Sequence, residues 1–173
     1  SDMEYLNYNP MHSNCSLIPG SGVDLIHFTR NNNRDYKIKY KFLFIGRLLF
    51  EKGICDYVEA INIIKDSKKN AYSEIACGIV GFIDDDRKDA ITIKDLSFWQ
   101  SKFNIQYLGR TDNVKDLLMI TDCIVLPSFY NEGVPRILLE AAAMELPVIT
   151  TDHPGCRNAV DHGLTGFLCK KKN

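Results

Sequence analysis

Two glutamates stand eight positions apart in the stretch SFYNEGVPRILLEAAAMELPVITTD, where Glu132 falls in a Gly/Pro turn and Glu140 in an apolar helical run. A carboxylate in apolar surroundings costs free energy unless a partner binds it. Along a helix, the two Cα atoms would lie about 12 Å apart, too far to act on one reacting atom. The pair could instead accept hydrogen bonds from hydroxyl groups at the two ends of one elongated ligand. A purely structural alternative leaves Glu132 in solvent and has Glu140 cap a neighbouring loop.

A second group of residues that could do chemistry lies in the loop GRLLFEKG, which directly follows an apolar run. Gly46 and Gly53 allow tight turns and a close approach of the backbone. Arg47 can bind phosphate oxygens through a fork of N–H groups, and Lys52 can supply a point charge. Because a helix starts directly after it, the loop predicts a diphosphate site, although a solvated basic loop would have the same composition.

Backbone amides at the start of the helix after the NEG turn form a third candidate. Gly133 and Val134 complete the turn, and Pro135 suits the first helical turn because its missing N–H is not needed there. The N–H groups up to Arg136 would point into a crevice and attract an anion. A further turn, TDHPGCRNAV, follows the next apolar run, and its His153 is interpreted as a turn residue rather than a catalyst.

The elements that position these loops alternate between short apolar runs and helical patterns. Strands this apolar on both faces, separated by helices, predict an α/β fold with a doubly wound, Rossmann-like parallel sheet. In such sheets, ligands bind beyond the carboxyl ends of the strands. Strands are expected at 41–46, 74–83, 104–109, 123–128, 147–152 and in TGFLC, and helices at 54–67, 85–103, 113–122, 134–145 and in GCRNAVDHG.

Composition and charge exclude several classes of protein. A formal net charge of −1 gives no indication of nucleic-acid binding or of electrostatic attachment to a membrane. No apolar run approaches the roughly 20 residues of a membrane span. The six cysteines are scattered without zinc-site spacing, which favours a reducing, cytoplasmic location and argues against a disulfide framework. The length suits one domain with a sizeable core.

The acidic run FIDDDRKD, at 82–89, resembles a metal-binding DxD motif. We prefer another interpretation, because acids at a helix start are explained by N-capping and by the helix dipole. This interpretation places the acids at the beginning of the helix expected over 85–103. No metal is therefore expected to bind at this position.

The three loops, in this order on this fold, resemble the C-terminal half of a GT-B glycosyltransferase of family 4. The resemblance runs from IPGSGVD through GRLLFEKG, IQYLGRTDNV and EGVPRILLEAAAMELPVITTD to HGLTGFL. Its specific part is the spacing of Glu132 and Glu140, with Gly133, Pro135 and the following LPVI strand. The tail is similar to enzymes that build capsule, O-antigen or lipid-linked oligosaccharides. Many relatives have Glu where this chain has Asn158, which puts any role of that position in doubt.

The resemblance implies roles for the predicted site residues. Gly46 and its neighbours would hold a nucleotide-sugar donor, with Arg47 and Lys52 on the diphosphate. Glu132 would contact the donor sugar, and backbone N–H groups between Gly133 and Arg136 would meet sugar and phosphate. This segment, Gly133, Val134, Pro135 and Arg136, is therefore expected to bind the donor. Glu140 would accept from the ribose hydroxyls. Catalytic roles are thus expected for Glu132, Arg47 and Lys52, with retention of anomeric configuration and no metal or other cofactor. The base would lie against the loops after 74–83 and 104–109.

The resemblance also implies that residues 41–173 are a donor-binding domain, preceded by a lead-in over 1–40 with a strand and turn at 16–24. The expected partners are an N-terminal acceptor domain of the same protein and a glycan or lipid-linked acceptor. Peripheral association of the full-length enzyme with the inner face of the membrane is also expected. UDP is the favoured nucleotide, while purine nucleotides stay open. The isolated domain is expected to bind nucleotide without transferring sugar, and to expose apolar side chains near the crevice.

Two alternatives remain open from the sequence. A sugar-nucleotide epimerase of the same architecture would need acid and base groups flanking a sugar carbon, and no such pair stands out. A non-catalytic nucleotide-binding module would tolerate replacement of Arg47 and Glu140 without a change in nucleotide affinity.

Overall fold

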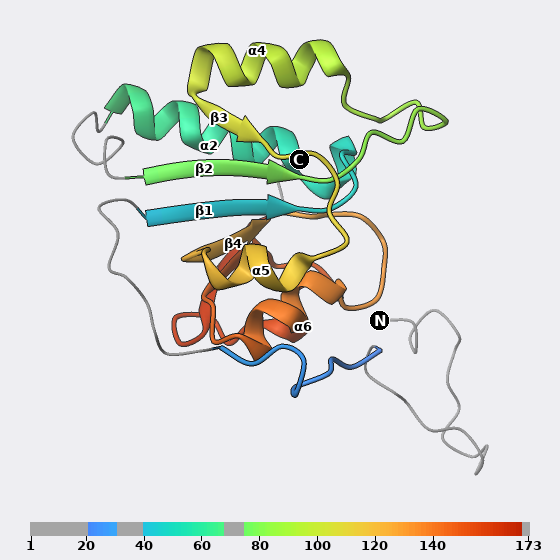
Figure 1. The fold of residues 1–173 in the computed structure, drawn as a ribbon, viewed down its shortest axis with the longest axis vertical. Coiled ribbons are helices and arrows are strands. Elements are labelled where there is room, and N and C mark those ends of the chain that lie inside the picture. The colour runs from blue at the N-terminus through green and yellow to red at the C-terminus, as the bar shows by residue number, and fades with distance from the viewer. Residues whose placement is uncertain (1–20, 31–39, 68–74, 171–173) are drawn as a thin grey trace.

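The structure of the protein is a computed structural model that describes residues 21–30, 40–67 and 75–170. Within these residues, six strands form one sheet in the order β3-β2-β1-β4-β5-β6, and every pairing between neighbouring strands is parallel (Figure 1). The strands are β1 (Tyr40–Ile45), β2 (Ile75–Val80), β3 (Ile105–Tyr107), β4 (Cys123–Leu126), β5 (Val148–Thr151) and β6 (Gly166–Cys169). The predicted doubly wound, Rossmann-like α/β fold is confirmed.

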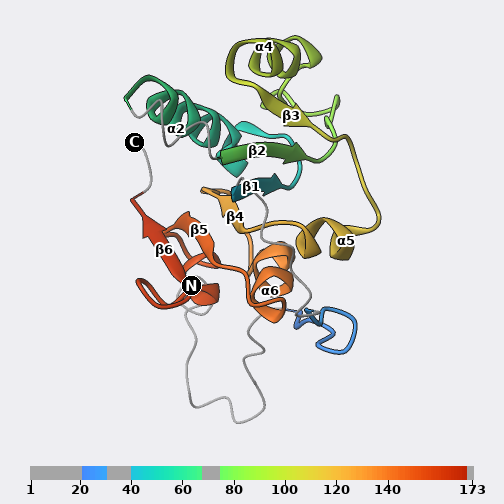
Figure 2. The ribbon, with the colours of Figure 1, turned by 60° about the vertical axis from the view of Figure 1, so that its left-hand side comes forward.

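Helices cover both faces of the sheet. In Figure 2, α2 and α4 lie on one side of it, whereas α5 and α6 lie on the other. The chain reverses between the two sides when it crosses from β3 at one edge back to β4 beside β1. The helical segments are α2 (Ile54–Ser67), α4 (Ile93–Phe103), α5 (Val114–Met119) and α6 (Arg136–Ala143), with single 3-10 turns η1 (Phe50–Lys52) and η2 (Arg157–Ala159).

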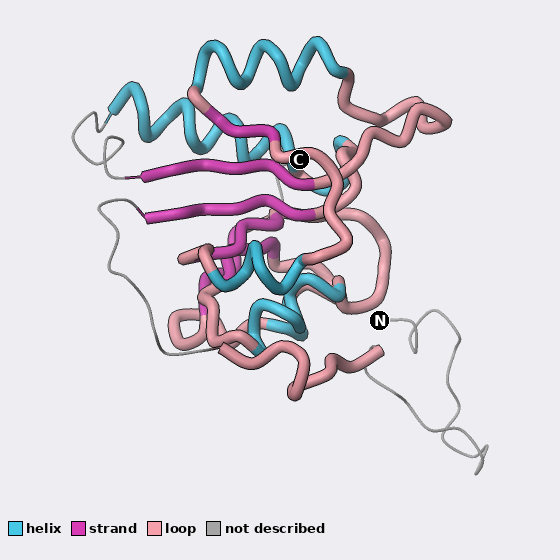
Figure 3. The backbone as a smooth tube through the Cα atoms, in the orientation of Figure 1, coloured by secondary structure: helices cyan, strands magenta, loops and turns pink. Residues whose placement is uncertain are grey.

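The core between these layers consists of the strand side chains and the inner faces of the helices. Phe44, Ile124 and Leu138 are fully buried, as the apolar runs predict for strands covered on both sides. Tyr57 on α2 is buried as well, and its hydroxyl donates to the carbonyl oxygens of β1 and β2. The sheet is thus a rigid support for the loops at its carboxyl edge, which gather at one end of the strands in Figure 3.

The prediction of a helix over 85–103 is wrong for its first part, because α4 begins only at Ile93. Thr92 caps it: its side chain accepts from the Asp95 backbone, and the Asp95 carboxylate accepts from the Thr92 backbone. The preceding residues form a loop that runs beside the 46–53 segment, with Ile91 N–H donating to Leu48 O at 2.8 Å. The acids of FIDDDRKD therefore do not cap this helix, and arginines partner two of them instead. In the described part of the chain, no group of three or more His, Cys, Asp or Glu side chains is arranged to hold a metal ion.

Other boundaries also differ from the sequence expectations. The helix expected over 134–145 spans only Arg136–Ala143, so Pro135 is its N-cap residue and lies outside its first turn. The expected short helix in GCRNAVDHG is a single 3-10 turn at 157–159. Most of the lead-in over 1–40 lies outside the described residues, including residues 16–20 of its expected strand and turn. In the described regions, no helix combines the length and apolarity that crossing a membrane requires.

Candidate functional site

Three of the strand-end loops converge at the carboxyl edge of the sheet. The loop after β1 contacts the loop after β4 through Gly53, where an added Cβ would lie 2.0 Å from the carbonyl oxygen of Pro127. The backbone N–H of Phe129 also donates to the carbonyl of Glu51 at 2.9 Å. Gly155, after β5, also approaches the loop after β4 closely, since an added Cβ there would lie 2.5 Å from Gly133 O. The loops are therefore packed backbone against backbone, which fixes the side chains that they carry.

Lys52 and Glu132, predicted as separate contacts to a ligand, form an ion pair with each other. The side chain of Lys52 is only 8% exposed, whereas that of Glu132 is 27% exposed and reaches solvent. A buried ammonium group is tolerated only when a partner satisfies it. Glu132 supplies that partner across the interface between the two loops. Both residues were predicted to belong to the site, but nothing in the sequence indicated that they pair with each other.

Arg47 extends from the same loop toward an acid and an aromatic ring. Its Nη1 lies 3.7 Å from the Asp84 carboxylate, so this acid of FIDDDRKD belongs to the site. Its guanidinium also lies 5.3 Å from the centre of the Tyr130 ring. Neither partner was among the predicted site residues. Asp84 directly follows the strand expected over 74–83, and this position could have marked it as a site residue. It was missed because the acids there were assigned to the start of a helix.

Glu140 is buried on α6, as its apolar neighbours predicted, with only 8% of the residue exposed. Arg136, one helical turn earlier, forms an ion pair with it at 3.7 Å, but the Arg136 side chain is 76% exposed. Burial raises the pKa of Glu140, while the charges of Arg136 and His27 lower it. The carboxylate is thus incompletely compensated within the described structure, which is consistent with a position that accepts hydrogen bonds from a ligand.

The remaining predicted donor-binding residues lie at the start of α6. Gly133 and Val134 lead into Pro135, which makes no side-chain cap hydrogen bond, and Leu138 N–H donates to the Pro135 carbonyl. The first turn of a helix presents backbone N–H groups and the positive end of the helix dipole. Arg136 adds a charged side chain at the same end. The segment therefore presents positive charge on the side of the turn that holds Glu132.

A hollow of about 380 Å³ lies at the carboxyl ends of β1 and β2, beside Arg47. It extends to the loop after β3, where Arg110 stacks 5.7 Å from the centre of the Phe82 ring. This is the region where the loops after 74–83 and 104–109 were expected to receive a nucleotide base. The lining residues are Ile45, Gly46, Arg47, Val80, Gly81, Phe82, Arg110, Thr111 and Asp112.

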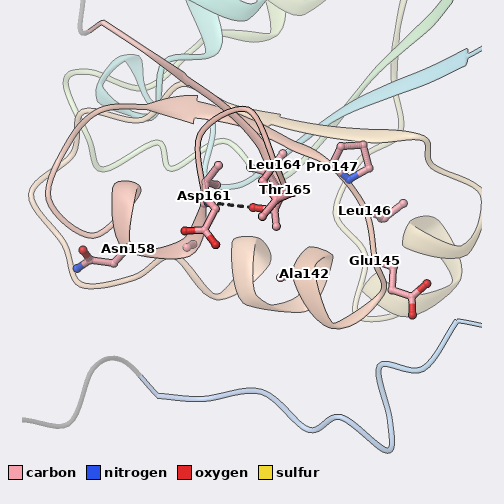
Figure 4. Close-up of a pocket in the computed structure, with 11 residues that line it drawn as sticks. Ala142, Glu145, Leu146, Pro147, Asn158, Asp161, Leu164 and Thr165 are labelled. Carbon is pink, nitrogen blue, oxygen red and sulfur yellow. Dashed lines mark hydrogen bonds between the residues drawn. The ribbon is translucent and has the colours of Figure 1, made fainter.

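A larger hollow of about 540 Å³ lies at the opposite edge, at the amino ends of β5 and β6 (Figure 4). Asn158 lines it together with Glu145, Leu146 and Asp161, and the backbone N–H of Asp161 donates to Thr165 Oγ1 at 2.9 Å. None of the predicted site residues lines this hollow. Because ligands of doubly wound sheets bind at the carboxyl edge, the smaller hollow beside Arg47 is the better candidate.

One cysteine and one histidine near the site, Cys156 and His153, make contacts within the fold. The described cysteines, Cys55, Cys77, Cys123, Cys156 and Cys169, are all free thiols. Cys156 lies beneath the site, where its Sγ contacts Ser128 O at 3.7 Å and burial raises its pKa. His153 lies in the turn after β5, and its backbone carbonyl accepts from Arg157 N–H at 3.0 Å, as expected of a turn residue.

Comparison with known proteins gives the class to which this fold and site correspond. Residues 26–173 match the Glycosyl transferases group 1 family. A Campylobacter jejuni relative, N,N'-diacetylbacillosaminyl-diphospho-undecaprenol alpha-1,3-N-acetylgalactosaminyltransferase, is 34% identical over 146 residues, covering 84% of this chain and 35% of its own. The putative teichuronic acid biosynthesis glycosyltransferase TuaC of Bacillus subtilis is 33% identical over 149 residues, covering 81% of this chain and 34% of its own.

Solved structures share the fold at lower identity. A glycosyltransferase from Rickettsia africae superimposes with a TM-score of 0.72 at 21% identity, covering 91% of this chain and 43% of that one. Anabaena HepE, solved in complex with UDP, superimposes with a TM-score of 0.68 at 18% identity, covering 86% of this chain and 42% of that one. The fold is that of one Rossmann-like half of a GT-B glycosyltransferase.

The chain belongs to the Glycosyl transferases group 1 family. It spans about a third of the length of the first curated relatives that it matches. The resemblance to a group 1 glycosyltransferase with the GT-B fold is thereby confirmed, whereas the assignment to family 4 stays a prediction.

Proposed function

We propose that this chain is the nucleotide-sugar-binding domain of a glycosyltransferase that builds cell-surface polysaccharide from UDP-sugars. The observation that carries the proposal is the convergence of Arg47, Lys52 and Glu132 at the carboxyl edge of the sheet, beside a hollow of about 380 Å³. The C. jejuni and B. subtilis relatives, named for transfer to an undecaprenol carrier and for teichuronic acid synthesis, support this class of product. UDP is favoured because an Escherichia coli relative, 30% identical over 167 residues, is named for UDP-Gal.

In this arrangement the base occupies the hollow between the loops after β1, β2 and β3. The diphosphate then lies between Arg47 and Lys52, and the ribose hydroxyls reach the Glu140 carboxylate. The first-turn N–H groups of α6 face the phosphate and sugar, and Glu132 lies beside the sugar hydroxyls. Binding would require the phosphate oxygens to replace Asp84 and Glu132 as partners of the two cations, which charge-assisted hydrogen bonds can accomplish.

The reaction that these residues suit is transfer with retention of anomeric configuration. An acceptor hydroxyl oxygen bonds to the anomeric carbon while the bond from that carbon to the diphosphate oxygen breaks. The acceptor proton passes to the departing diphosphate on the same face, and Arg47 and Lys52 stabilise the charge that develops there. The alternative of two carboxylates acting as in retaining hydrolases would require carboxyl groups about 5–5.5 Å apart. The positions of Glu132, paired with Lys52 in the turn, and Glu140, paired with Arg136 on α6, do not suggest that arrangement.

The proposal assigns the acceptor site to an N-terminal domain of the full-length enzyme, with a glycan or lipid-linked acceptor. Exposed apolar side chains at the carboxyl edge support a partner surface there: Phe50 is 54% exposed, Phe82 40% and Leu108 48%. Peripheral contact of the full-length enzyme with a membrane remains part of the same proposal. The isolated domain should bind nucleotide without transferring sugar.

Calorimetric titration of the chain with UDP, GDP and ADP tests this function. We expect saturable binding of UDP, weakened by about 10-fold to 150-fold in both Arg47→Ala and Glu140→Gln, because each removes a contact to or from a charged group. Burial raises the pKa of Glu140 in the folded state. The folded state therefore loses stability as the pH rises above the ordinary pKa of a glutamate side chain and this carboxyl group ionises. Glu140→Gln should therefore be at least as stable as the wild type at pH 7, so that lost binding does not reflect unfolding. Unchanged affinity in both variants would favour a nucleotide-binding module that uses other residues.

A further inference from the structure

The ring of Tyr130 is the common neighbour of three cations that come from two loops, the loop after β1 and the loop before α4. Arg47, from the loop after β1, has its guanidinium carbon 5.3 Å from the ring centre. Lys52, from η1, has its ammonium nitrogen 4.9 Å from that centre. Arg87, from the loop before α4, lies 6.0 Å away. All three distances fall within the range in which an aromatic face attracts a cation.

The position of this ring is set by the turn that carries it. The Tyr130 N–H donates to the hydroxyl of Ser128 at 3.3 Å, and Ser128 is fully buried. The preceding residue, Phe129, is tied to the carbonyl of Glu51 by its N–H and packs edge-on against Phe50, with ring centres 5.6 Å apart. The turn after β4 is therefore joined to η1 through Phe129 before Tyr130 and through the ion pair of Glu132 with Lys52 after it, which fixes the backbone that carries the ring.

Each of the three cations also has a carboxylate partner. Arg47 pairs with Asp84, Lys52 with Glu132, and Arg87 with Asp89. An incoming diphosphate competes with these carboxylates for the same N–H donors. The ring does not compete, because it attracts a cation through its face and accepts no in-plane hydrogen bond from a stacked guanidinium. The ring can thus hold the cations in place while their partners exchange.

We propose that Tyr130 is a positioning residue for the diphosphate of the donor, holding Arg47 and Lys52 in register while phosphate oxygens take the place of Asp84 and Glu132. This inference rests on the proposed function, since it assigns the same site. It names a residue that acts through the two cations and does not itself touch the phosphate. The hydroxyl group of Tyr130 has no part in this role, so phenylalanine should replace tyrosine without loss.

Titration of the wild type, Tyr130→Phe and Tyr130→Leu with UDP and with uridine tests the inference. We expect Tyr130→Leu to bind UDP about 5-fold to 30-fold more weakly, in line with the loss of two cation–ring contacts, and Tyr130→Phe to stay within about twofold of the wild type. Uridine carries no phosphate, so its affinity should be the same in all three proteins. Tyr40→Leu is a matched control, because Tyr40 is 63% exposed at the start of β1, at the far edge of the sheet.

A second series keeps the shape of the ring and changes only its charge distribution. Successive fluorination of a phenylalanine at position 130 weakens the negative potential of the ring face, and UDP affinity should fall with each step. Equal UDP affinity across this series, or an equal loss for UDP and uridine in Tyr130→Leu, would overturn the positioning role while leaving the donor site intact. Failure of the wild type to bind UDP, GDP or ADP would instead overturn the proposed function, and this inference with it.

Discussion

Replacing Gly53 by alanine is expected to lower the free energy of unfolding by about 2–5 kcal/mol. Gly53 ends η1 with φ +77°, a left-handed conformation that costs an L-residue about 1–2 kcal/mol. The added methyl group would also lie 2.0 Å from the carbonyl oxygen of Pro127, so one of the two loops must move. Forcing atoms into such a close contact typically costs about 1–3 kcal/mol more. The same movement would separate Lys52 from Glu132 and weaken nucleotide binding.

Urea denaturation of Gly53→Ala beside Gly163→Ala separates the two contributions. Gly163 has φ +80°, and a Cβ there would meet nothing within 4 Å, so this control carries the backbone strain without the contact. We expect the control to lose about 1–2 kcal/mol and Gly53→Ala to lose clearly more. Equal losses would show that the loops after β1 and β4 are not packed against each other as the structure describes.

The variant Lys52→Met is expected to lose about 10-fold to 150-fold in UDP affinity, because it removes a charge-assisted contact to the diphosphate. Methionine keeps most of the apolar stem of the buried Lys52 side chain and leaves Glu132, which is 27% exposed, to be hydrated. The fold should therefore persist, and calorimetric titration reports the loss of the charge. Because Lys52 is buried and paired across the loops, its replacement should act more strongly than that of the exposed Arg136.

Lys94→Met provides the matched control for that measurement. Lys94 is exposed in the first turn of α4, outside the carboxyl-edge loops, and its replacement changes the net charge by the same amount. UDP affinity close to that of the wild type in Lys94→Met, together with a large loss in Lys52→Met, assigns the effect to the site. A similar small loss in both would mean that Lys52 does not grip the diphosphate.

The fold was predictable because its signal is local. The successive residues 43–45 and 123–126 of the apolar runs are buried, and the helices between the strands have apolar residues at helical spacing, so the parallel sheet follows. The error over 85–92 has a local cause as well. Acids are common both at helix starts and in loops, and the capping box formed by Thr92 and Asp95 was the stronger start signal.

The contacts within the site were harder to predict because they join distant segments. Lys52 and Glu132 were both identified, but their pairing depends on the close approach of Gly53 to Pro127 across two loops. The role of Tyr130 could not be predicted, because a tyrosine in a turn is common. Only the structure shows that three cations lie near its ring. The Arg136–Glu140 pair, by contrast, follows from i, i+4 spacing on one helix and could have been inferred.

A crystal structure of this chain with UDP bound would test the central claim most directly. We expect the diphosphate between Arg47 and Lys52, the base in the hollow lined by Gly46, Phe82 and Thr111, and the ribose hydroxyls at Glu140. UDP bound instead in the hollow beside Asn158, at the amino ends of β5 and β6, would contradict it. UDP at the carboxyl edge without contacts to Arg47 and Lys52 would contradict it as well.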